Sequence, residues 1–292
     1  MTIASGFESF VAEKAPLAAR TWLGLGGAAE LLATPTSVEQ LAALVTRCRD
    51  ERAPVRVLGG GSNLLIRDEG VAGVVVLLSA PCFASVSVSR STVTAGGGAS
   101  LAEAITLSVG AGLAGLDALV GIPGAVGGAL HGNSGSHGGD IGQWVQQVTV
   151  MTRSGEVITR QRDEMVFGYR ESSLDELVVV DATFQLDEDD PNRLTKRMQK
   201  QWIVKKANQP MADERTASIF KNPRGMSAGS LIDQAGLKGA SVGGAVVSDK
   251  HGNYIVARDG ATSDDVLKLI DLVRSRVAER LGVELETSLE IW

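Results

Sequence analysis

Apolar residues recur at helical spacing in two segments of the chain, and each segment begins with a capping pattern. Ser37 with Gln40 precedes the first, and Thr262 with Asp265 precedes the second, which Gly282 would end. The apolar faces comprise Leu41, Leu44, Val45 and Cys48 in the first segment, and Val266, Leu269, Ile270, Val273 and Val277 in the second. The pattern predicts one amphipathic helix near the start of the chain and a longer one near its end.

Short apolar runs bounded by turn residues predict β-strands between these helices. The expected strands are 55–58, 74–78, 86–89, 93–95, 147–153, 156–160 and 177–186, with Ser154-Gly155 as a hairpin turn. A helix capped by Ser100 and Glu103 and a polar helix over about 192–207 complete the pattern. The acidic stretch 187–191 is typical of a surface joint, so we expect a boundary there.

Charge is unevenly distributed along the 292 residues. The net charge is −6, which argues against nucleic acid or an anionic membrane as the main partner. Residues 190–250, however, carry eleven Lys and Arg against five Asp and Glu. Either a solvated helix or a site for an anionic substrate accounts for this basic region.

Cysteine usage and hydropathy indicate the compartment. Cys48 and Cys82 match neither a redox nor a zinc spacing, so we expect free thiols in a reducing environment. The longest apolar stretch, 118–130, has 13 residues with one proline and four glycines, short of the roughly 20 that span a bilayer. The first residues show no signal-peptide pattern. These features predict a cytoplasmic protein without a membrane segment.

Glycine is concentrated in two turns, at 59–63 and in 121–140, where eight of twenty residues are glycine. Neither turn matches a Rossmann fingerprint, because the sixth position from Gly59 is Leu64, and no P-loop sequence is present. Successive backbone amides in such turns can bind a pyrophosphate. The alternative is that both turns are merely tight connections.

Five strings in this order resemble the UDP-N-acetylenolpyruvoylglucosamine reductase family. They are VRVLGGGSNLL, GIPGAVGGALHGNSGSHGGDIG, FGYRESS, SIFKNP and DQAGLKG, and the resemblance extends from about Thr21 to the C-terminus. It implies an α+β protein with a two-lobed FAD-binding domain of the p-cresol methylhydroxylase (vanillyl-alcohol oxidase) type over 17–189, with lobes of about 17–80 and 81–189. A smaller α+β substrate-binding domain over 190–292 would follow.

The resemblance also implies a reaction. The family reduces the enolpyruvyl group of UDP-N-acetyl-3-O-(1-carboxyvinyl)-glucosamine to UDP-N-acetylmuramate for peptidoglycan and cell-wall synthesis. NADPH reduces FAD, and hydride then passes to the vinyl methylene. The expected cofactors are therefore FAD and NADPH, with no obligatory protein partner and no metal.

Two residues match the family's catalytic positions, and a third position departs from them. Arg170 would stabilise the enolate, since a guanidinium binds both oxygens of a carboxylate, and Ser218 would donate the proton. Ser288 occupies the place of a catalytic glutamate near the C-terminus. If residues 286–290 form a strand, Glu286, Ser288 and Glu290 share one face, so either a water-mediated acid at Ser288 or Glu290 would fill the role.

The resemblance extends to binding residues. Main chain or side chains expected at the cofactor are Gly59, Gly60, Gly61, Ser62, Asn63, Gly121, Ile122, Pro123, Gly124, Gly127, Gly128 and Asn133. Those expected at the substrate are Tyr169, Lys206, Lys221 and Asn222. His131 and His137 lack a metal-ligand spacing and are expected to line the flavin loop.

Two other functions stay open from sequence alone. One is a flavin oxidase or dehydrogenase that shares the FAD-binding domain and needs no NADPH. The other is a flavoprotein that binds a nucleotide sugar without turning it over, which the serine at position 288 would explain.

Overall fold

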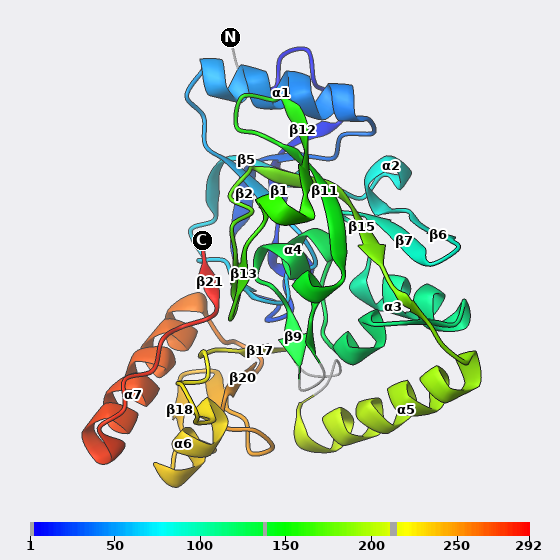
Figure 1. Ribbon diagram of the computed structural model, residues 1–292. Coiled ribbons are helices and arrows are strands. Elements are labelled where there is room, and N and C mark those ends of the chain that lie inside the picture. Colours follow the sequence, from blue (N-terminus) through cyan, green and yellow to red (C-terminus); the bar gives the residue numbers. More distant parts are fainter. Residues whose placement is uncertain (1–2, 137–138, 211–214) are drawn as a thin grey trace. The chain divides into compact units, whose positions relative to one another are not determined.

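The computed structural model describes residues 3–136, 139–210 and 215–292 (Figure 1). The chain divides into two compact units, each built from segments distant in sequence. Unit 1 comprises Met1–Ala15, Ala29–Gly60 and Ala72–Ile203, and unit 2 comprises Pro16–Ala28, Gly61–Val71 and Val204–Trp292. This division differs from the expected continuous domains, because two N-terminal segments pack with the C-terminal residues.

One sheet of unit 1 has four strands in the order β1-β2-β5-β3. Their bounds are Val11–Pro16, Ala28–Ala33, Val71–Leu77 and Val55–Leu58. Helix α1 (Val38–Asp50) buries its four predicted apolar residues in the same core as Val74 and Val76. Ser37 accepts from the Gln40 amide as predicted, but the Gln40 side chain accepts from Thr36 instead of returning to Ser37, so only half of the capping box forms.

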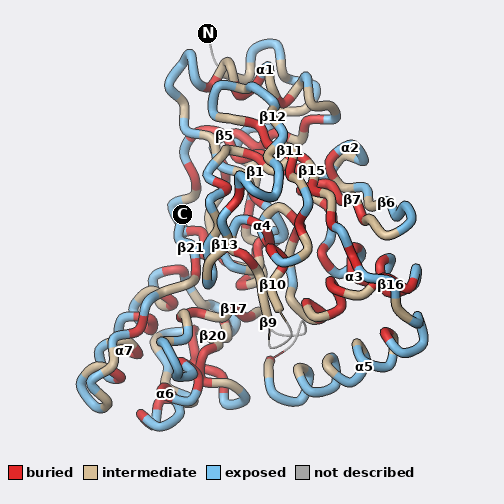
Figure 2. The backbone as a smooth tube through the Cα atoms, in the orientation of Figure 1, coloured by how far each residue is buried: buried red, intermediate tan, exposed pale blue. Residues whose placement is uncertain are grey.

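The second sheet of unit 1 is antiparallel, with the order β12-β11-β15-β7-β6. Its strands are Val157–Gln161, Val145–Met151, Val178–Gln185, Thr92–Gly96 and Val86–Ser89. The predicted hairpin joins β11 to β12. Buried residues follow β11 and β15 through the middle of this sheet (Figure 2). Helices α3 (Leu101–Gly110) and α4 (Val126–His131) share its core.

The start of α3 is not capped by the Ser100 side chain, contrary to the prediction. The Leu101 amide instead donates to the carbonyl of Gly124, 3.1 Å away. A loop distant in sequence therefore satisfies this helix end, which a local pattern could not reveal.

Short elements complete unit 1. The helices are α2 Pro81–Ala84 and the 3-10 turns Leu116–Leu119, Ile141–Gln143 and Arg162–Glu164. The strands are β8 Leu113–Ala114, β9 Gly135–Ser136, β10 Gly139–Asp140, β13 Phe167–Gly168, β14 Glu171–Ser172 and β16 Asp187–Glu188. Helix α5 (Pro191–Asn208) follows. The acidic stretch 187–191, where a boundary was expected, therefore leads into this helix. The boundary between the two units falls later, between Ile203 and Val204.

Unit 2 is built around a four-stranded antiparallel sheet, in the order β17-β20-β19-β18, and two helices. The strands are Thr216–Ser218, Tyr254–Ala257, Ala245–Val247 and Ser241–Val242, and the helices are α6 Ala228–Gln234 and α7 Ser263–Leu281. The predicted Thr262–Asp265 capping box and the left-handed Gly282 both form on α7. The 3-10 turn Ala18–Arg20 also belongs here.

A parallel pair of short strands also belongs to unit 2. Strand β4 (Leu64–Leu65) pairs with β21 (Glu290–Ile291), and the Arg67 amide donates to the carbonyl of Trp292. This pairing explains why Gly61–Val71 belongs with the C-terminal residues.

Cys48 and Cys82 are free thiols, as predicted, and burial raises the pKa of Cys48 to about 11. Within the described ranges, none of the helices has the length and apolar character needed to cross a bilayer.

Candidate active site

The two glycine-rich turns predicted to hold a cofactor meet within unit 1. A Cβ added to Gly60 would lie 2.6 Å from the Cα of Gly124, so the turns touch through main chain alone. Gly59 and Gly60 are exposed, and so is Gly128 in α4, the helix that follows the other glycine-rich turn. Uncovered backbone from two adjoining turns suits a pyrophosphate, which amide groups bind without a cationic side chain.

We expect Gly60→Ala to destabilise unit 1, because the new methyl group would overlap the backbone of Gly124. Such overpacking costs roughly 1–3 kcal/mol. Thermal unfolding of the FAD-free protein measures it. Gly59→Ala is the matched control, since its methyl would lie 3.6 Å from the Ala125 side chain, an ordinary contact. Equal melting temperatures for the two variants would contradict close approach of the turns.

The chain crosses between units immediately after Gly60. Gly61 has a φ of 63°, and an added Cβ would lie 2.1 Å from the carbonyl oxygen of Arg20 in unit 2. Ser62 and Asn63 follow in the same unit. The Asn63 side chain donates to the Ser288 carbonyl at 2.9 Å, and its own carbonyl accepts from the Glu290 amide. Asn63 therefore holds the C-terminal segment, a role that its placement in a glycine turn did not indicate.

Arg170 lies at the tip of a two-residue hairpin in unit 1. Strands β13 and β14 pair Gly168 with Glu171, which leaves Tyr169 and Arg170 as the connecting residues. Both are exposed, and the Arg170 guanidinium carbon lies 5.9 Å from the centroid of the Tyr169 ring. Arg170 has a φ of 62°, which costs an L-residue with a side chain roughly 1–2 kcal/mol. No carboxylate among the described residues forms an ion pair with it.

The hairpin is anchored to the end of α4. Asn133 is buried; its Nδ2 donates to the Gly168 carbonyl at 2.7 Å and its Oδ1 accepts from the Gly142 amide. Ser172 donates to the carbonyl of His131. The Asn133 side chain thus links the glycine-rich turn to the Arg170 hairpin through hydrogen bonds within unit 1. His137 lies outside the described residues.

Ser218 is the last residue of β17 in unit 2 and is half-buried. Its Oγ accepts a hydrogen bond from Nδ2 of Asn253, 3.3 Å away. Asn253 is buried and precedes β20, the strand that pairs with β17. Sequence inspection missed Asn253. The available signal was a polar residue within a turn directly before an apolar strand.

The imidazole ring of His251 contacts Asn253 and Tyr254, next to Ser218. Nδ1 accepts from the Asn253 amide at 3.2 Å, and the ring meets Tyr254 edge to face. Burial, and then the charge of Lys238, lower the pKa of His251. The neutral ring is therefore the form that the folded protein favours.

This shift predicts a loss of stability in mild acid. Because the unfolded chain binds the His251 proton more readily, the stabilisation is complete above the unfolded pKa of about 6.5 and is lost as pH falls through the lower folded value. Urea unfolding of the wild type between about pH 7 and about pH 5, compared with His251→Gln, measures this contribution. A constant difference between the two proteins across that range would contradict it.

The C-terminal segment of unit 2 is not a continuous strand from Glu286 to Glu290. The amides of Ser288 and Leu289 both donate to the carbonyl of Ile219, at 2.7 and 3.2 Å, which is the pattern of a β-bulge. Within this segment a ladder of two residues forms only at Glu290–Ile291, and Thr287 makes a single antiparallel bridge to Phe220. The alternation from which a shared face was predicted is thus interrupted at Ser288. Ser288 is half-buried, whereas Glu290 is exposed and its carboxylate accepts from the Trp292 indole.

The predicted substrate residues lie in both units. Tyr169 is on the unit 1 hairpin, whereas Lys206, Lys221 and Asn222 belong to unit 2. Lys206 is exposed on α5. Lys221 pairs with Glu286 at 2.6 Å, and Oδ1 of Asn222 accepts from the Ala228 amide at the start of α6. All six basic residues of 190–208 lie on α5, where Leu194 is the buried residue, as expected of a solvated helix.

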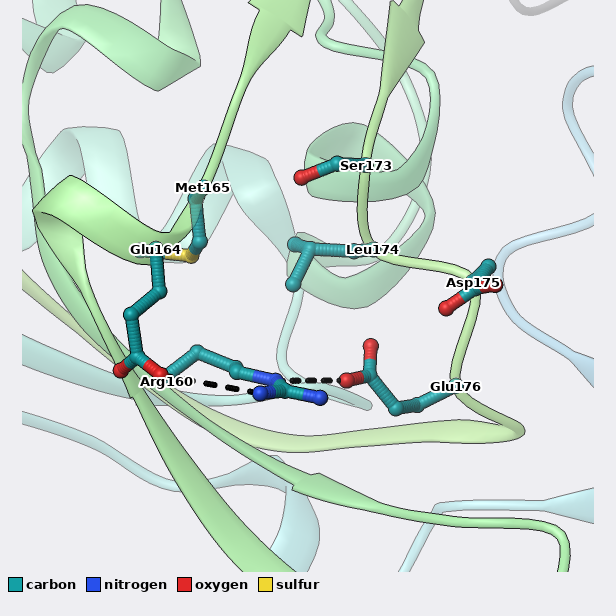
Figure 3. Close-up of a pocket in the computed structure, with 7 residues that line it drawn as sticks. All are labelled: Arg160, Glu164, Met165, Ser173, Leu174, Asp175 and Glu176. Carbon is teal, nitrogen blue, oxygen red and sulfur yellow. Dashed lines mark hydrogen bonds and ion pairs between the residues drawn. The ribbon is translucent and has the colours of Figure 1, made fainter.

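A pocket of about 200 Å³ lies beside the hairpin segment in unit 1 (Figure 3). Its lining consists of Arg160, Glu164, Met165, Ser173, Leu174, Asp175 and Glu176. Arg160 donates to Glu176 at 2.8 Å and lies 3.6 Å from Glu164. None of the sequence-predicted site residues lines this pocket, and its only cation is paired within it.

Comparison with known proteins covers nearly the whole chain. Residues 29–160 match the FAD binding domain model, and residues 209–292 match the model of the UDP-N-acetylenolpyruvoylglucosamine reductase C-terminal domain. The reductase of that name from Rhodopirellula baltica is 40% identical over 282 residues, which cover 97% of this chain and 92% of the relative. The chain belongs to the UDP-N-acetylenolpyruvoylglucosamine reductase family.

Other members of the reductase family agree with this assignment. The Listeria innocua relative is 38% identical and covers 94% of this chain and 93% of its own length. The crystal structure of the Thermus caldophilus reductase has a TM-score of 0.83 at 37% identity, covering 97% of this chain and all of that one. Cholesterol oxidase from B. sterolicum, at 17% identity and a TM-score of 0.50, is similar in fold alone over 64% of this chain and 39% of that one. The α+β architecture and the FAD-binding domain were therefore predicted correctly.

Proposed function

We propose that Arg170 and Ser218 are the residues with which this chain performs its family's reaction. The chain is an FAD-containing, NADPH-dependent oxidoreductase that reduces the enolpyruvyl group of UDP-N-acetyl-3-O-(1-carboxyvinyl)-glucosamine to give UDP-N-acetylmuramate, a peptidoglycan precursor. The observation that carries this function is the family match over 97% of the chain, with its FAD-binding and C-terminal domain models in order. The residue roles below are our assignments.

Main chain at Gly59, Gly60 and 121–128 fits the cofactor, because the two turns adjoin without intervening side chains. When bound, FAD would accept a hydride from NADPH and pass it to the substrate. Gly61, Ser62 and Asn63 continue the first turn in unit 2, where Asn63 orders the C-terminal segment.

Arg170 binds the substrate carboxylate and stabilises the negative charge that spreads onto it during reduction. The guanidinium fork holds both oxygens and keeps its charge at any working pH. It suits the task because no described carboxylate neutralises it, and because Asn133 and Ser172 fix the base of its hairpin. A charge held in place before the reaction stabilises the transition state without reorganisation.

Ser218 donates the proton that completes the reduction. A hydroxyl is a weak acid, so it needs a donor that stabilises the oxygen as the proton leaves. The half-buried position of Ser218 and the amide at its Oγ provide such an environment. We propose that the UDP-sugar contacts Tyr169, Lys206, Lys221 and Asn222. When it binds, Lys221 would leave its ion pair with Glu286 and pair with a phosphate instead.

Ser288 is proposed to fill the third role through a bound water, since Glu290 is exposed and lies beyond the bulge. We expect Ser288→Glu to preserve turnover or raise it, with roughly 10²-fold as the upper range for an added acid. Steady-state kcat measures this, and Ser288→Gln, which adds length without an acid, is the control. A collapse in kcat with FAD still bound would show that the position is misassigned.

Anaerobic titration tests the proposed function directly. NADPH should bleach the flavin absorbance, and the enolpyruvyl sugar nucleotide should then restore it. An oxidase would consume oxygen with an alcohol substrate and need no NADPH, and a non-catalytic flavoprotein would stay bleached. We further propose that the enzyme acts in the cytoplasm, without an obligatory protein partner.

A further inference from the structure

We infer that Asn253 is a positioning residue that aims the Ser218 hydroxyl and stabilises its oxygen as the proton leaves. The inference rests on the proposed role of Ser218 as proton donor. Asn253 would act through Ser218 and not on the substrate itself. The experiments below distinguish a wrong role for Asn253 from a wrong function for the protein.

The Asn253 amide has a fixed orientation. Its Oδ1 accepts from the Phe220 N–H at 2.9 Å, and its Nδ2 donates to the Phe220 carbonyl at 2.8 Å. The Ile219 amide donates to the Asn253 carbonyl, so side chain and main chain both join the same segment. Rotating the amide by half a turn would place NH₂ against N–H and oxygen against oxygen. With Asn253 only 6% exposed, water could not relieve that mismatch.

This orientation determines what Ser218 can do. The second Nδ2 hydrogen of Asn253 points to Ser218 Oγ, 3.3 Å away. An amide nitrogen does not accept hydrogen bonds, so the Ser218 hydrogen cannot return to Asn253. The serine therefore accepts from Asn253 and has its own hydrogen directed elsewhere. A hydroxyl that otherwise rotates freely becomes a directed donor.

The same contact changes the acidity of the hydroxyl. When the Ser218 O–H bond breaks and a C–H bond forms on the substrate carbon, the electron pair stays on Oγ. The Asn253 donor then faces an oxygen that gains negative charge, and such hydrogen bonds strengthen as charge develops. The alkoxide recovers a proton from water, which balances the step. Burial makes the contact more effective than it would be in solvent.

A double-mutant cycle tests the inference. Asn253→Asp keeps the shape of the side chain and an acceptor for the Phe220 amide but removes both donors. We expect flavin reoxidation by substrate to slow by up to roughly 10²-fold, with flavin reduction by NADPH unchanged. In a Ser218→Ala background, the same substitution should cause no further slowing. An equal loss in both backgrounds would overturn the inference, because a merely structural role does not depend on the Ser218 oxygen.

A second measurement needs neither a foldable Asn253 variant nor turnover. Side-chain amide NMR of the holoenzyme resolves the two Nδ2 hydrogens of Asn253. In Ser218→Ala, the hydrogen that faces Oγ should shift upfield while the one donated to Phe220 keeps its position. Two unchanged resonances would overturn the inference. If Ser218→Ala produces the expected shift but the wild type shows no sugar-dependent reoxidation, only the proposed function is overturned.

Discussion

Ser218→Ala is expected to slow reoxidation of the reduced flavin by the enolpyruvyl substrate by about 10²–10⁴-fold, the range for loss of a positioned acid. Reduction of the flavin by NADPH should keep its wild-type rate, because Ser218 gives its proton only to the substrate. Stopped-flow absorbance, with each half-reaction measured anaerobically, separates the two rates. Substrate affinity should change little, since the hydroxyl acts in the transition state rather than in binding.

A nearby serine provides the control for this experiment. Ser230 lies on α6 in unit 2, is exposed, and its side chain has no assigned role. Ser230→Ala should leave both half-reactions at the wild-type rate. Equal slowing of both half-reactions by Ser218→Ala would contradict the assignment, because a defect shared by both steps would indicate misfolding or weaker flavin binding.

The sequence predicted those parts of the fold that local residues determine. Helix α7 is an example, because its cap, its apolar stripe and its terminal glycine all lie within the segment they specify. The β11–β12 hairpin is another, since Ser154-Gly155 joins two strands directly. In each case the residues that make the structure are neighbours in sequence.

The features that escaped prediction depend on partners distant in sequence. The start of α3 is satisfied by Gly124 rather than by Ser100, and β4 pairs with β21 across more than two hundred residues. That pairing brings the segment after Gly60 into unit 2 and gives Asn63 its partner. No periodicity within a short window could contain this information.

The candidate site shows the same difference between local features, which the sequence predicts, and features that depend on distant partners. Motifs led to Arg170 and Ser218 as proposed catalytic residues, but those motifs did not indicate the residues that hold them in place. Asn133 was predicted at the cofactor, and its side chain also anchors the hairpin, because its buried amide is used by Gly168 and Gly142. Asn253 gave only a weak local signal, a polar residue in a turn before an apolar strand, because its importance comes from strand pairing that brings it beside Ser218.

Arg170→Gly is expected to slow substrate reduction by roughly 10²–10³-fold or more, the cost of removing a group that stabilises developing negative charge. The same substitution should leave the free energy of unfolding unchanged or up to about 1 kcal/mol higher, because glycine adopts a positive φ without strain. Arg170 has a φ of 62° at the tip of its hairpin, where an arginine is an unfavourable choice for the backbone.

The opposite signs of these two effects separate the role of the charge from that of the fold. Arg170→Lys serves as the comparison, since it keeps the charge and the strained backbone but loses the fork that binds both carboxylate oxygens. Its rate should lie between those of the wild type and Arg170→Gly, whereas its stability should match the wild type. Urea unfolding and stopped-flow reoxidation on the same three proteins provide the data. If Arg170→Gly unfolded more easily and kept its rate, the arginine would be a structural residue of the hairpin. If it lost rate while gaining stability, the backbone strain at position 170 would be tolerated because the reaction needs a guanidinium there.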